Sequence, residues 1–513
     1  MKIFEALARF SLARASAVRA RVGGTRKPQR PRGRQLSVPL AARTQGQQAR
    51  EPGDHLNAKS FPVDPSLPQL EIIGDPELMR EVFQRHLRPL DGENYQVREC
   101  LISHTRYRMA TRCVLQYTLR LANPETGRER SQWVTGVMYA GDRTQRIWEE
   151  LRRSDLGRAV PGASPTFAPF SYIPDLDMLV QVFPYDRRLP ALPLLMEGPP
   201  PELEPLLLAR FGLGDWRAEA WNVEPVRYLT EKRATLRLTA RAQDAATGRA
   251  EEKRFYAKVY HDEEGERTHQ VLRALWEKAD AGEAGFTVAR PIAYLSDLRT
   301  LVQEEVSGTS LQDMLRRGDD VTSVVRKVAR ALATLHLNND VVAPRHHRLR
   351  DNVARLERAG KFLQRTCPHL RTEIEEAVGG VVAGLEEAPL APTHGDLRPD
   401  HIMLDGDRLI LIDLDDFAWG DPILDVGRLS AVLAKVHLRS PLHHDHPRAV
   451  AQTFVEEYFA HVPEAWRTRL PLHYAGAYLR LAFGLLRHQS PGWPDKVEAM
   501  VEEARDSLAG KVW

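Results

Sequence analysis

Two aspartates of this chain stand in a pattern that suits phosphoryl transfer. Asp396 lies in a short loop, and Asp413 ends an apolar run that follows it. Between them, two apolar runs flank Asp405 and Gly406, which accept positive φ, so the pattern predicts a β-hairpin. Such a hairpin would bring both carboxylates to the same end. One carboxylate could then accept a hydroxyl proton while the other holds a metal ion on nucleotide phosphates.

The motifs around these aspartates resemble those of the aminoglycoside phosphotransferase and choline kinase superfamily. The matching stretches are His394-Gly395-Asp396, Ile412-Asp413 and Gly420-Asp421-Pro422-Ile423-Leu424-Asp425. The resemblance implies a protein-kinase-like fold and activity on small molecules. It makes Asp396 the catalytic base and Asp413 a metal ligand. The same resemblance gives His394, Asp421 and Asp425 structural roles, as braces of the loop and of the helix that follows.

One position departs from the superfamily pattern. Where the superfamily has an asparagine as its second metal ligand, this chain has His401. Asp413 and His401 would then hold Mg²⁺. Because an imidazole nitrogen is a softer ligand than the amide oxygen that suits Mg²⁺, Mn²⁺ could take its place. The alternative is a weak or inactive pseudokinase that senses nucleotide or acts as a scaffold. Because Asp396, Asp413 and Lys258 are all present, an active kinase is favoured.

Upstream of the catalytic stretch, the chain carries the same series of short motifs twice. The matched pairs are Asp75-Pro76-Glu77-Leu78 with Pro200-Pro201-Glu202-Leu203, Arg106-Tyr107 with Arg227-Tyr228, Thr126-Gly127-Arg128 with Thr247-Gly248-Arg249, and Leu179-Val180-Gln181 with Leu301-Val302-Gln303. Their nearly constant spacing predicts duplicated domains rather than a solenoid. Each copy reads as a helix, two or three strands, a second helix and two more strands. Both motifs of the first pair, Asp75-Pro76-Glu77-Leu78 and Pro200-Pro201-Glu202-Leu203, are expected to open the helix that leads their copy.

The second copy leads into the catalytic stretch, so we expect it to be the small, nucleotide-binding lobe. Its residues 256–260 resemble the kinase strand whose lysine grips the nucleotide phosphates, which assigns that role to Lys258; a solvated strand lysine is the alternative. The first copy has Val137 at the matching position. A valine cannot bind phosphate, and the first copy is therefore predicted to be a non-catalytic small lobe.

Other nucleotide contacts are expected in the same copy. Its first strand turn lacks a glycine-rich phosphate loop but contains Lys232 and Arg233, which could help to hold phosphate. The resemblance places the hinge between the lobes at residues 301–308. Backbone groups of Glu304 and Val306 in that hinge would bind the adenine of ATP.

These patterns predict an α+β, protein-kinase-like bilobal fold preceded by a second, degenerate small-lobe-like domain. The predicted segments are a disordered basic tail (1–60), the degenerate repeat (61–195), the nucleotide-binding small lobe (196–310) and the catalytic and substrate-binding large lobe (311–513). Beyond Asp425, apolar spacing predicts helices over 427–438, 449–461, 472–487 and 494–508. The superfamily recognises its acceptor substrate in this helical part.

Composition narrows the class of protein. With 513 residues, 42% of them hydrophobic and 27% charged, the chain has enough apolar material for packed cores in more than one domain. No apolar run is long enough to span a membrane. The three scattered cysteines, Cys100, Cys113 and Cys367, favour a cytoplasmic location. The net charge of +3 combines a basic N-terminal segment with a mildly acidic remainder, so nucleic-acid binding is not expected.

Two basic or histidine-rich segments leave more than one interpretation. Residues 1–55 suit a disordered tail, an organelle presequence, or a basic arm for a membrane or polyanion. The tail is favoured. The run His-His-Asp-His at 443–446 could hold a metal, although consecutive loop histidines are more often solvated.

The sequence thus predicts a cytoplasmic phosphotransferase that moves the γ-phosphate of ATP to a hydroxyl of an aminoglycoside, amino alcohol or sugar. A protein kinase is less favoured, because the segment from Asp413 to Asp425 is too short for an activation loop that docks peptides. The expected partner is the small-molecule acceptor, and self-association through the first copy is left open. Neither nucleic acid nor a membrane is expected as a partner.

Overall fold

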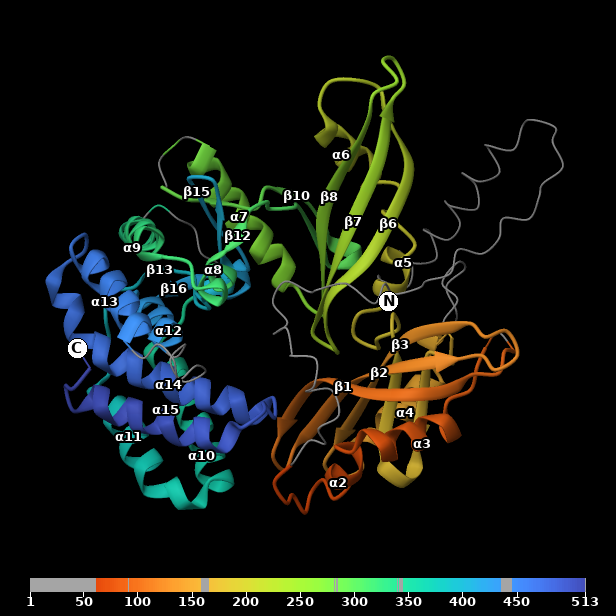
Figure 1. Ribbon diagram of the computed structural model, residues 1–513, viewed down its shortest axis with the longest axis horizontal. Helices are drawn as coiled ribbons and strands as arrows, with labels where there is room; N and C mark the ends of the chain where they lie inside the picture. The colour runs from red at the N-terminus through yellow and green to blue at the C-terminus, as the bar shows by residue number, and fades with distance from the viewer. Residues whose placement is uncertain are drawn as a thin grey trace. The chain divides into compact units, whose positions relative to one another are not determined.

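The computed structural model describes residues 61–90, 92–157, 166–280, 282, 285–338, 340, 345–434 and 445–512. The predictions for residues 1–60 and for the side chains of 443–446 lie outside these described residues. Contacts divide the chain into two compact units (Figure 1). The first contains the described residues up to Glu266 together with Ile292–Gln303, and the second contains Arg267–Pro291 and Glu304–Trp513. The boundary between the two units, at Gln303 and Glu304, therefore lies within the predicted hinge.

Two five-stranded sheets with the same strand order build the first unit (Figure 1). The first sheet has the order β1-β2-β3-β5-β4, with strands β1 (Gln96–Arg108), β2 (Arg112–Ala122), β3 (Glu129–Tyr139), β4 (Phe170–Ile173) and β5 (Met178–Val182). The second has the order β6-β7-β8-β11-β10, with strands β6 (Trp216–Leu229), β7 (Arg233–Asp244), β8 (Ala250–Tyr260), β10 (Pro291–Leu295) and β11 (Thr300–Glu304). A helix follows the third strand in each copy, α4 (Arg143–Arg152) in one and α7 (Glu264–Asp280) in the other. This common topology agrees with the repeated motifs, while the domain bounds and the duplication itself stay predictions.

The two copies also fix the tips of their first hairpins with the same contacts. Asp64 accepts hydrogen bonds from Tyr107 and the backbone of Ala110, and Asp186 accepts them from Tyr228 and the backbone of Glu231. Ala110 and Glu231 both have left-handed backbone, with φ of 53° and 59°. Both aspartates stand in the pattern Phe-Pro-x-Asp-x-x-Leu-Pro-x-Leu, at 61–70 and 183–192. This repeated pattern was not predicted, although it is visible in the amino-acid sequence.

The helices that lead the two copies differ. Short helices α2 (Leu70–Ile73), α3 (Pro76–His86), α5 (Leu192–Leu195) and α6 (Glu204–Leu208) precede or link the sheets. Asp75 caps α3 by accepting the backbone N–H groups of Glu77 and Leu78. The expectation that Pro200-Pro201-Glu202-Leu203 opens the second helix is wrong, because these residues form a turn in which the backbone N–H groups of Leu203 and Glu204 both bond to the carbonyl of Pro200. That helix starts at Glu204 instead.

The second unit is mainly helical around two small sheets. Its helices are α8 (Leu311–Arg317), α9 (Thr322–Leu337), α10 (Leu349–Thr366), α11 (Arg371–Gly384), α12 (Ile423–Ala434), α13 (Asp445–Phe459), α14 (Leu470–Arg487) and α15 (Trp493–Leu508). Its strands are β9 (Thr287–Val288), β12 (Thr309–Ser310), β13 (Ala391–Thr393), β14 (Ile402–Asp405), β15 (Arg408–Leu411) and β16 (Ala418–Gly420). Sheets and helices of this kind confirm the α+β class. In the part of the chain that the structure describes, no helix combines the length and apolar character needed to cross a bilayer.

Candidate active site

The predicted catalytic hairpin is present. Strands β14 and β15 pair antiparallel, with Asp405 opposite Arg408, which leaves Gly406 and Asp407 as the two-residue loop. The turn thus lies one residue later than the predicted Asp405-Gly406 turn. Gly406 has a φ of 57° at the first loop position, which glycine adopts without steric cost, while Asp405 stays extended in the ladder.

His401 connects the two aspartates at the open end of this hairpin. Its Nδ1 donates a hydrogen bond to the backbone carbonyl of Asp396 at 2.9 Å, and its Nε2 lies 3.4 Å from Oδ2 of Asp413. The imidazole is buried, and this burial lowers the pKa of His401 to about 4. The ring is therefore neutral near pH 7, with the proton on Nδ1, and the Nε2 lone pair accepts a hydrogen bond from Arg398. Sequence reasoning placed these three residues together, and the structure does so.

The residues around Asp413 provide only part of the ligand set that a divalent cation needs. Asp413 supplies a carboxylate, but the Arg398 guanidinium donates to Nε2 of His401 at 3.0 Å and to Asp400 at 2.7 Å. Among the described residues, no group of three or more His, Cys, Asp or Glu side chains could hold a metal. Asp413 suits Mg²⁺ that takes its other ligands from water and phosphates. His401 can bind the metal through Nε2 only if Arg398 moves away from this atom. Its role as a ligand stays a prediction.

The backbone at Asp413 is unusual. Its φ of 61° is left-handed, which costs free energy in a residue other than glycine and persists only where neighbours enforce it. The preceding carbonyl, of Ile412, accepts a hydrogen bond from Nε2 of His394 at 3.0 Å. His394 is fully buried, and it ties the loop before β14 to the end of β15. The bracing contact expected of His394 is therefore present.

Asp425, on the first turn of α12, holds the other side of the loop. Its carboxylate accepts the backbone N–H groups of His394 at 2.6 Å and of Gly395 at 2.9 Å. Burial raises the pKa of Asp425, but the hydrogen bond and charge of His336 and the interactions with His394 together outweigh burial and keep this pKa below its usual range. Gly395 cannot be replaced here, because a Cβ on it would lie 2.2 Å from the carbonyl oxygen of Asp416.

Asp421 anchors the start of α12. Its Oδ1 accepts the backbone N–H of Ile423 at 3.0 Å, and its Oδ2 accepts hydrogen bonds from Arg469 and His473, each at 2.9 Å. This cap explains why α12 begins at Ile423 rather than at the predicted Gly427. Burial raises the pKa of Asp421, but the hydrogen bond from His473 and the charge of Arg469 hold it well below its usual range.

We expect the second unit to lose stability in acid. Asp421 and Asp425 have depressed folded pKa values, so their stabilisation is complete above the unfolded pKa of about 3.9 and is lost as pH falls through the folded values. Each pKa unit corresponds to about 1.4 kcal/mol. The unfolding temperature, followed by circular dichroism from pH 7 to pH 3 at constant ionic strength, should fall. Asp421→Asn should flatten the decline, and an unfolding temperature that is flat or rising in wild type would contradict the assignment.

The predicted base has a partner that sequence reasoning missed. Asp396 forms an ion pair with Arg428 on α12, and both side chains are largely buried. Burial raises the pKa of Asp396, whereas the charges of Arg428 and then Arg398 lower it below the usual range. The carboxylate is therefore ionised. Arg428 lies one helical turn after Asp425, on the same face of α12, and this spacing was the available signal.

Lys258 lies in the first unit, on β8. Phe255, Ala257 and Val259 of this strand are buried in an apolar core with α5 and α6, so the strand alternation puts Lys258 on the other face of the sheet. At the matching place in the first sheet, Val137 is fully buried in a core of its own copy. The phosphate role of Lys258 stays a prediction.

The hinge residues Glu304 and Val306 are half-buried, and the backbone N–H of Glu304 donates to the carbonyl of Arg290 at 2.9 Å. That N–H is therefore already bonded. The adenine-binding roles of Glu304 and Val306 stay predictions.

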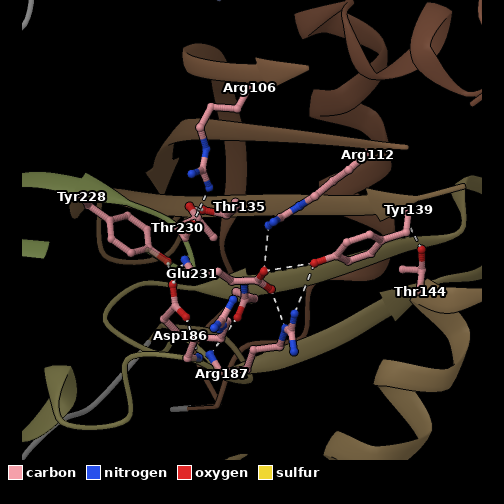
Figure 2. A network of polar contacts seen from close by, with 12 residues as sticks. Arg106, Arg112, Thr135, Tyr139, Thr144, Asp186, Arg187, Tyr228, Thr230 and Glu231 are labelled. Atoms are coloured by element: carbon pink, nitrogen blue, oxygen red, sulfur yellow. Dashed lines mark hydrogen bonds and ion pairs between the residues drawn. The ribbon is translucent and has the colours of Figure 1, made fainter. Parts of the chain in front are cut away.

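The β6–β7 turn, which was predicted to help hold phosphate, is anchored on the first copy. Figure 2 shows Glu231 of this turn facing Arg112, Arg187 and Tyr139. Its carboxylate accepts bonds from Arg112 at 2.7 Å, Arg187 at 2.5 Å and the Tyr139 hydroxyl at 3.2 Å. The Glu231 side chain is 1% exposed. The Glu231 side chain thus binds residues of the first copy.

The neighbouring residues of the turn behave differently. Thr230 lies 3.1 Å from the Thr135 hydroxyl, and its carbonyl accepts a bond from Arg106 (Figure 2). Lys232 is exposed and Arg233 is half-buried. Their predicted phosphate contacts stay untested, but the backbone that presents them is held by the first copy.

Comparison with known proteins identifies a protein family that the chain matches. A model of the phosphotransferase enzyme family matches residues 213–472, which include the sheet of the second copy and the catalytic loop. No curated protein matches the chain. The first copy lies outside the matched residues.

Among solved structures, the chain is similar to a choline/ethanolamine kinase family protein from Mesorhizobium loti (18% identity, 53% of this chain and 89% of that chain, TM-score 0.37). It is also similar to a choline kinase from Cryptosporidium parvum Iowa II (8% identity, 57% and 91%, TM-score 0.39). A third similar structure is a thermostable mutant of aminoglycoside phosphotransferase APH(4)-Ia (14% identity, 60% and 98%, TM-score 0.38).

Proposed function

This chain belongs to the phosphotransferase enzyme family, and we propose that it transfers the γ-phosphate of ATP to a hydroxyl group of a small molecule. The observation that carries the proposal is the meeting of Asp396 and Asp413 through His401 at one end of the β14–β15 hairpin. A base and a metal-binding carboxylate held this way are the parts that phosphoryl transfer needs.

In this mechanism the acceptor oxygen forms a bond to the γ-phosphorus, the bond from that phosphorus to the β-phosphate oxygen breaks, and ADP leaves. Asp396 orients the acceptor hydroxyl and takes its proton. The charge of Arg428 keeps Asp396 ionised before the reaction. Asp413 would hold Mg²⁺, which would supply positive charge to stabilise the phosphate oxygens. Asp425 and His394 hold the loop so that Asp396 meets the hydroxyl in one geometry.

A specific observation favours the alternative of a nucleotide-binding protein with weak transfer. Two polar groups of the site are engaged by arginines, Asp396 by Arg428 and Nε2 of His401 by Arg398. In that alternative these pairs persist with nucleotide bound, and ATP binds without turnover.

The test combines binding and transfer on wild type and Asp413→Ala. ATP with Mg²⁺ at about 100 times its dissociation constant should add roughly 2.7 kcal/mol of stability to wild type, seen as a raised unfolding temperature. The variant should lose the metal-dependent part. ADP release with a panel of hydroxyl compounds separates the two candidates, because only the active enzyme releases ADP. A larger effect of Mn²⁺ would indicate His401 as a ligand, and the absence of any shift with either metal would refute nucleotide binding.

A further inference from the structure

The Arg398 guanidinium is hydrogen-bonded to His401 beside the proposed metal ligand Asp413. Nδ1 of His401 lies 2.9 Å from the backbone carbonyl of Asp396, and a carbonyl only accepts, so Nδ1 carries a proton. Nη2 of Arg398 lies 3.0 Å from Nε2 of His401, and a guanidinium only donates, so Nε2 is the acceptor. The one lone pair of this imidazole is therefore used by Arg398. A metal ion could bind Nε2 only in place of the guanidinium.

Arg398 is held in this position from a second side. Its Nη2 also lies 2.7 Å from Oδ2 of Asp400, and the backbone N–H of His401 donates to the carbonyl of Arg398 at 2.9 Å. These bonds close the short helical turn Pro399–His401, which follows Arg398 directly. The His401 side chain is only 4% exposed, so packing also restrains the imidazole ring. The guanidinium is therefore placed before any ligand arrives, as an electrostatic binding group must be.

The bonds within the protein leave part of this guanidinium unsatisfied. The hydrogen bonds that Arg398 makes from its side chain to described residues all use Nη2. Its Nε is buried and has no hydrogen-bond partner among the same residues, and a buried donor without a partner costs free energy. The Arg398 side chain as a whole stays 30% exposed. A ligand that brings acceptor oxygens to this side chain would offset part of that cost.

The neighbours of Arg398 indicate which ligand this is. Nε2 of His401, which accepts from Arg398, also lies 3.4 Å from Oδ2 of Asp413. Asp413 is the carboxylate proposed to hold Mg²⁺ on the nucleotide phosphates, so those phosphates would come close to the guanidinium. Guanidinium groups bind phosphate oxygens through directed, charge-assisted hydrogen bonds. A divalent cation on Nε2 would instead be repelled by a permanent positive charge.

We propose that Arg398, oriented by His401 and Asp400, binds the nucleotide phosphates, and that Asp413 holds the one divalent cation of the site. This inference rests on the proposed function. His401 is then a positioning residue for Arg398 rather than a metal ligand. Arg398 supplies the positive charge that a second cation supplies in kinases with two metal ions.

Counting metal ions tests this arrangement without any variant. The full chain is mixed with Mn²⁺ and AMP-PCP, an ATP analogue whose methylene bridge resists hydrolysis and contains no nitrogen. Electron paramagnetic resonance measures the unbound Mn²⁺ and thereby gives the number of ions bound with each bound analogue. We expect one ion, with no spin-echo modulation from a directly bound imidazole nitrogen. Two ions, or an imidazole modulation that disappears in His401→Leu, would overturn the inference.

Variants test the role of Arg398. Arg398→Met should raise the dissociation constant of AMP-PCP with Mg²⁺ about tenfold, because it removes a charge-assisted hydrogen bond to phosphate. Arg398→Lys should restore part of the affinity, since it keeps the charge without the planar fork. Arg408→Met removes an exposed arginine of β15 and is the matched control, which should leave the affinity unchanged. An affinity of Arg398→Met equal to that of wild type would contradict the proposal.

A double-mutant cycle separates the two possible roles of His401. Where His401 acts by orienting Arg398, His401→Leu should weaken AMP-PCP binding, and adding Arg398→Met should cost little more. Losses that add, together with a lowered Mn²⁺ affinity in His401→Leu, would make His401 a metal ligand and overturn the inference. Failure of wild type to bind AMP-PCP with either metal would instead refute the proposed function.

Discussion

An Asp396→Asn variant is expected to transfer phosphate about 10³-fold more slowly than wild type, with nearly unchanged affinity for ATP. The amide keeps the size of the side chain but cannot accept the hydroxyl proton, and a positioned general base contributes about 10²- to 10⁴-fold. The loop itself should stay in place, because it is held by backbone bonds to Asp425 and by His394. ADP release at saturating nucleotide, measured with the best acceptor, checks the rate.

The matched control is Asp416→Asn. Asp416 is an exposed carboxylate close enough to Arg480 to affect its pKa, but it lacks the ion pair that Asp396 makes. This control should change the rate by less than about tenfold. A rate for Asp396→Asn within tenfold of wild type would show that another group takes the proton. Equal losses in both variants would instead point to a general effect of negative charge.

The catalytic end of the hairpin could be predicted from the local amino-acid sequence. Two apolar runs around an Asp-Gly pair fix a hairpin, and a hairpin necessarily brings the residues before and after it together. The error of one residue in the turn arose because both Asp405 and Gly406 accept turn conformations, and only the pairing of Asp405 with Arg408 decides between them. The structural roles of Asp425 and Asp421 were predicted from the motif resemblance, and their hydrogen bonds to the loop and to α12 are present.

The arginine contacts of the site were not predictable in the same way. Arg428 contacts Asp396 because α12 runs past the loop, and Arg398 contacts His401 because a short turn places them on one side. Neither contact follows from hydrophobic periodicity, since it depends on how elements pack. The left-handed φ of Asp413 has only a weak signal in the sequence: aspartate is one of the residues enriched in this region, but the residue type alone does not select this aspartate from the others.

The repeat was visible as spaced motifs, whereas the docking of its copies was not. Glu231 reads in sequence as an ordinary polar turn residue. In the structure it is buried and meets Arg112 and Arg187 of the first copy and its linker, which lie far away in sequence. Burial raises the pKa of Glu231, but the charges of Arg112 and then Arg187 outweigh burial and lower it below the usual range. The carboxylate is therefore a charge that only this docking satisfies.

Removing both arginines is expected to destabilise the first unit by about 3–5 kcal/mol, because it leaves the Glu231 charge buried without a partner. The double variant Arg112→Met with Arg187→Met tests this, with the unfolding temperature and amide hydrogen exchange of the β6–β7 turn as readouts. Adding Glu231→Leu should recover much of the loss, since removing all partners of a buried pair is often nearly neutral. Arg146→Met breaks the exposed pair with Asp142 and should change stability by less than about 1 kcal/mol.

The double variant also tests whether the first copy matters for nucleotide binding. The turn that Glu231 anchors presents Lys232 and Arg233, so its loosening should raise the KM for ATP more than it lowers kcat. The triple variant should regain stability but not the full affinity for ATP, because leucine cannot fix the turn through directed bonds to the first copy. A double variant as stable as wild type would show that the charges of Glu231, Arg112 and Arg187 are solvated rather than buried. If the double variant is destabilised but its KM for ATP is unchanged, the first copy stabilises the fold without affecting the phosphate contacts.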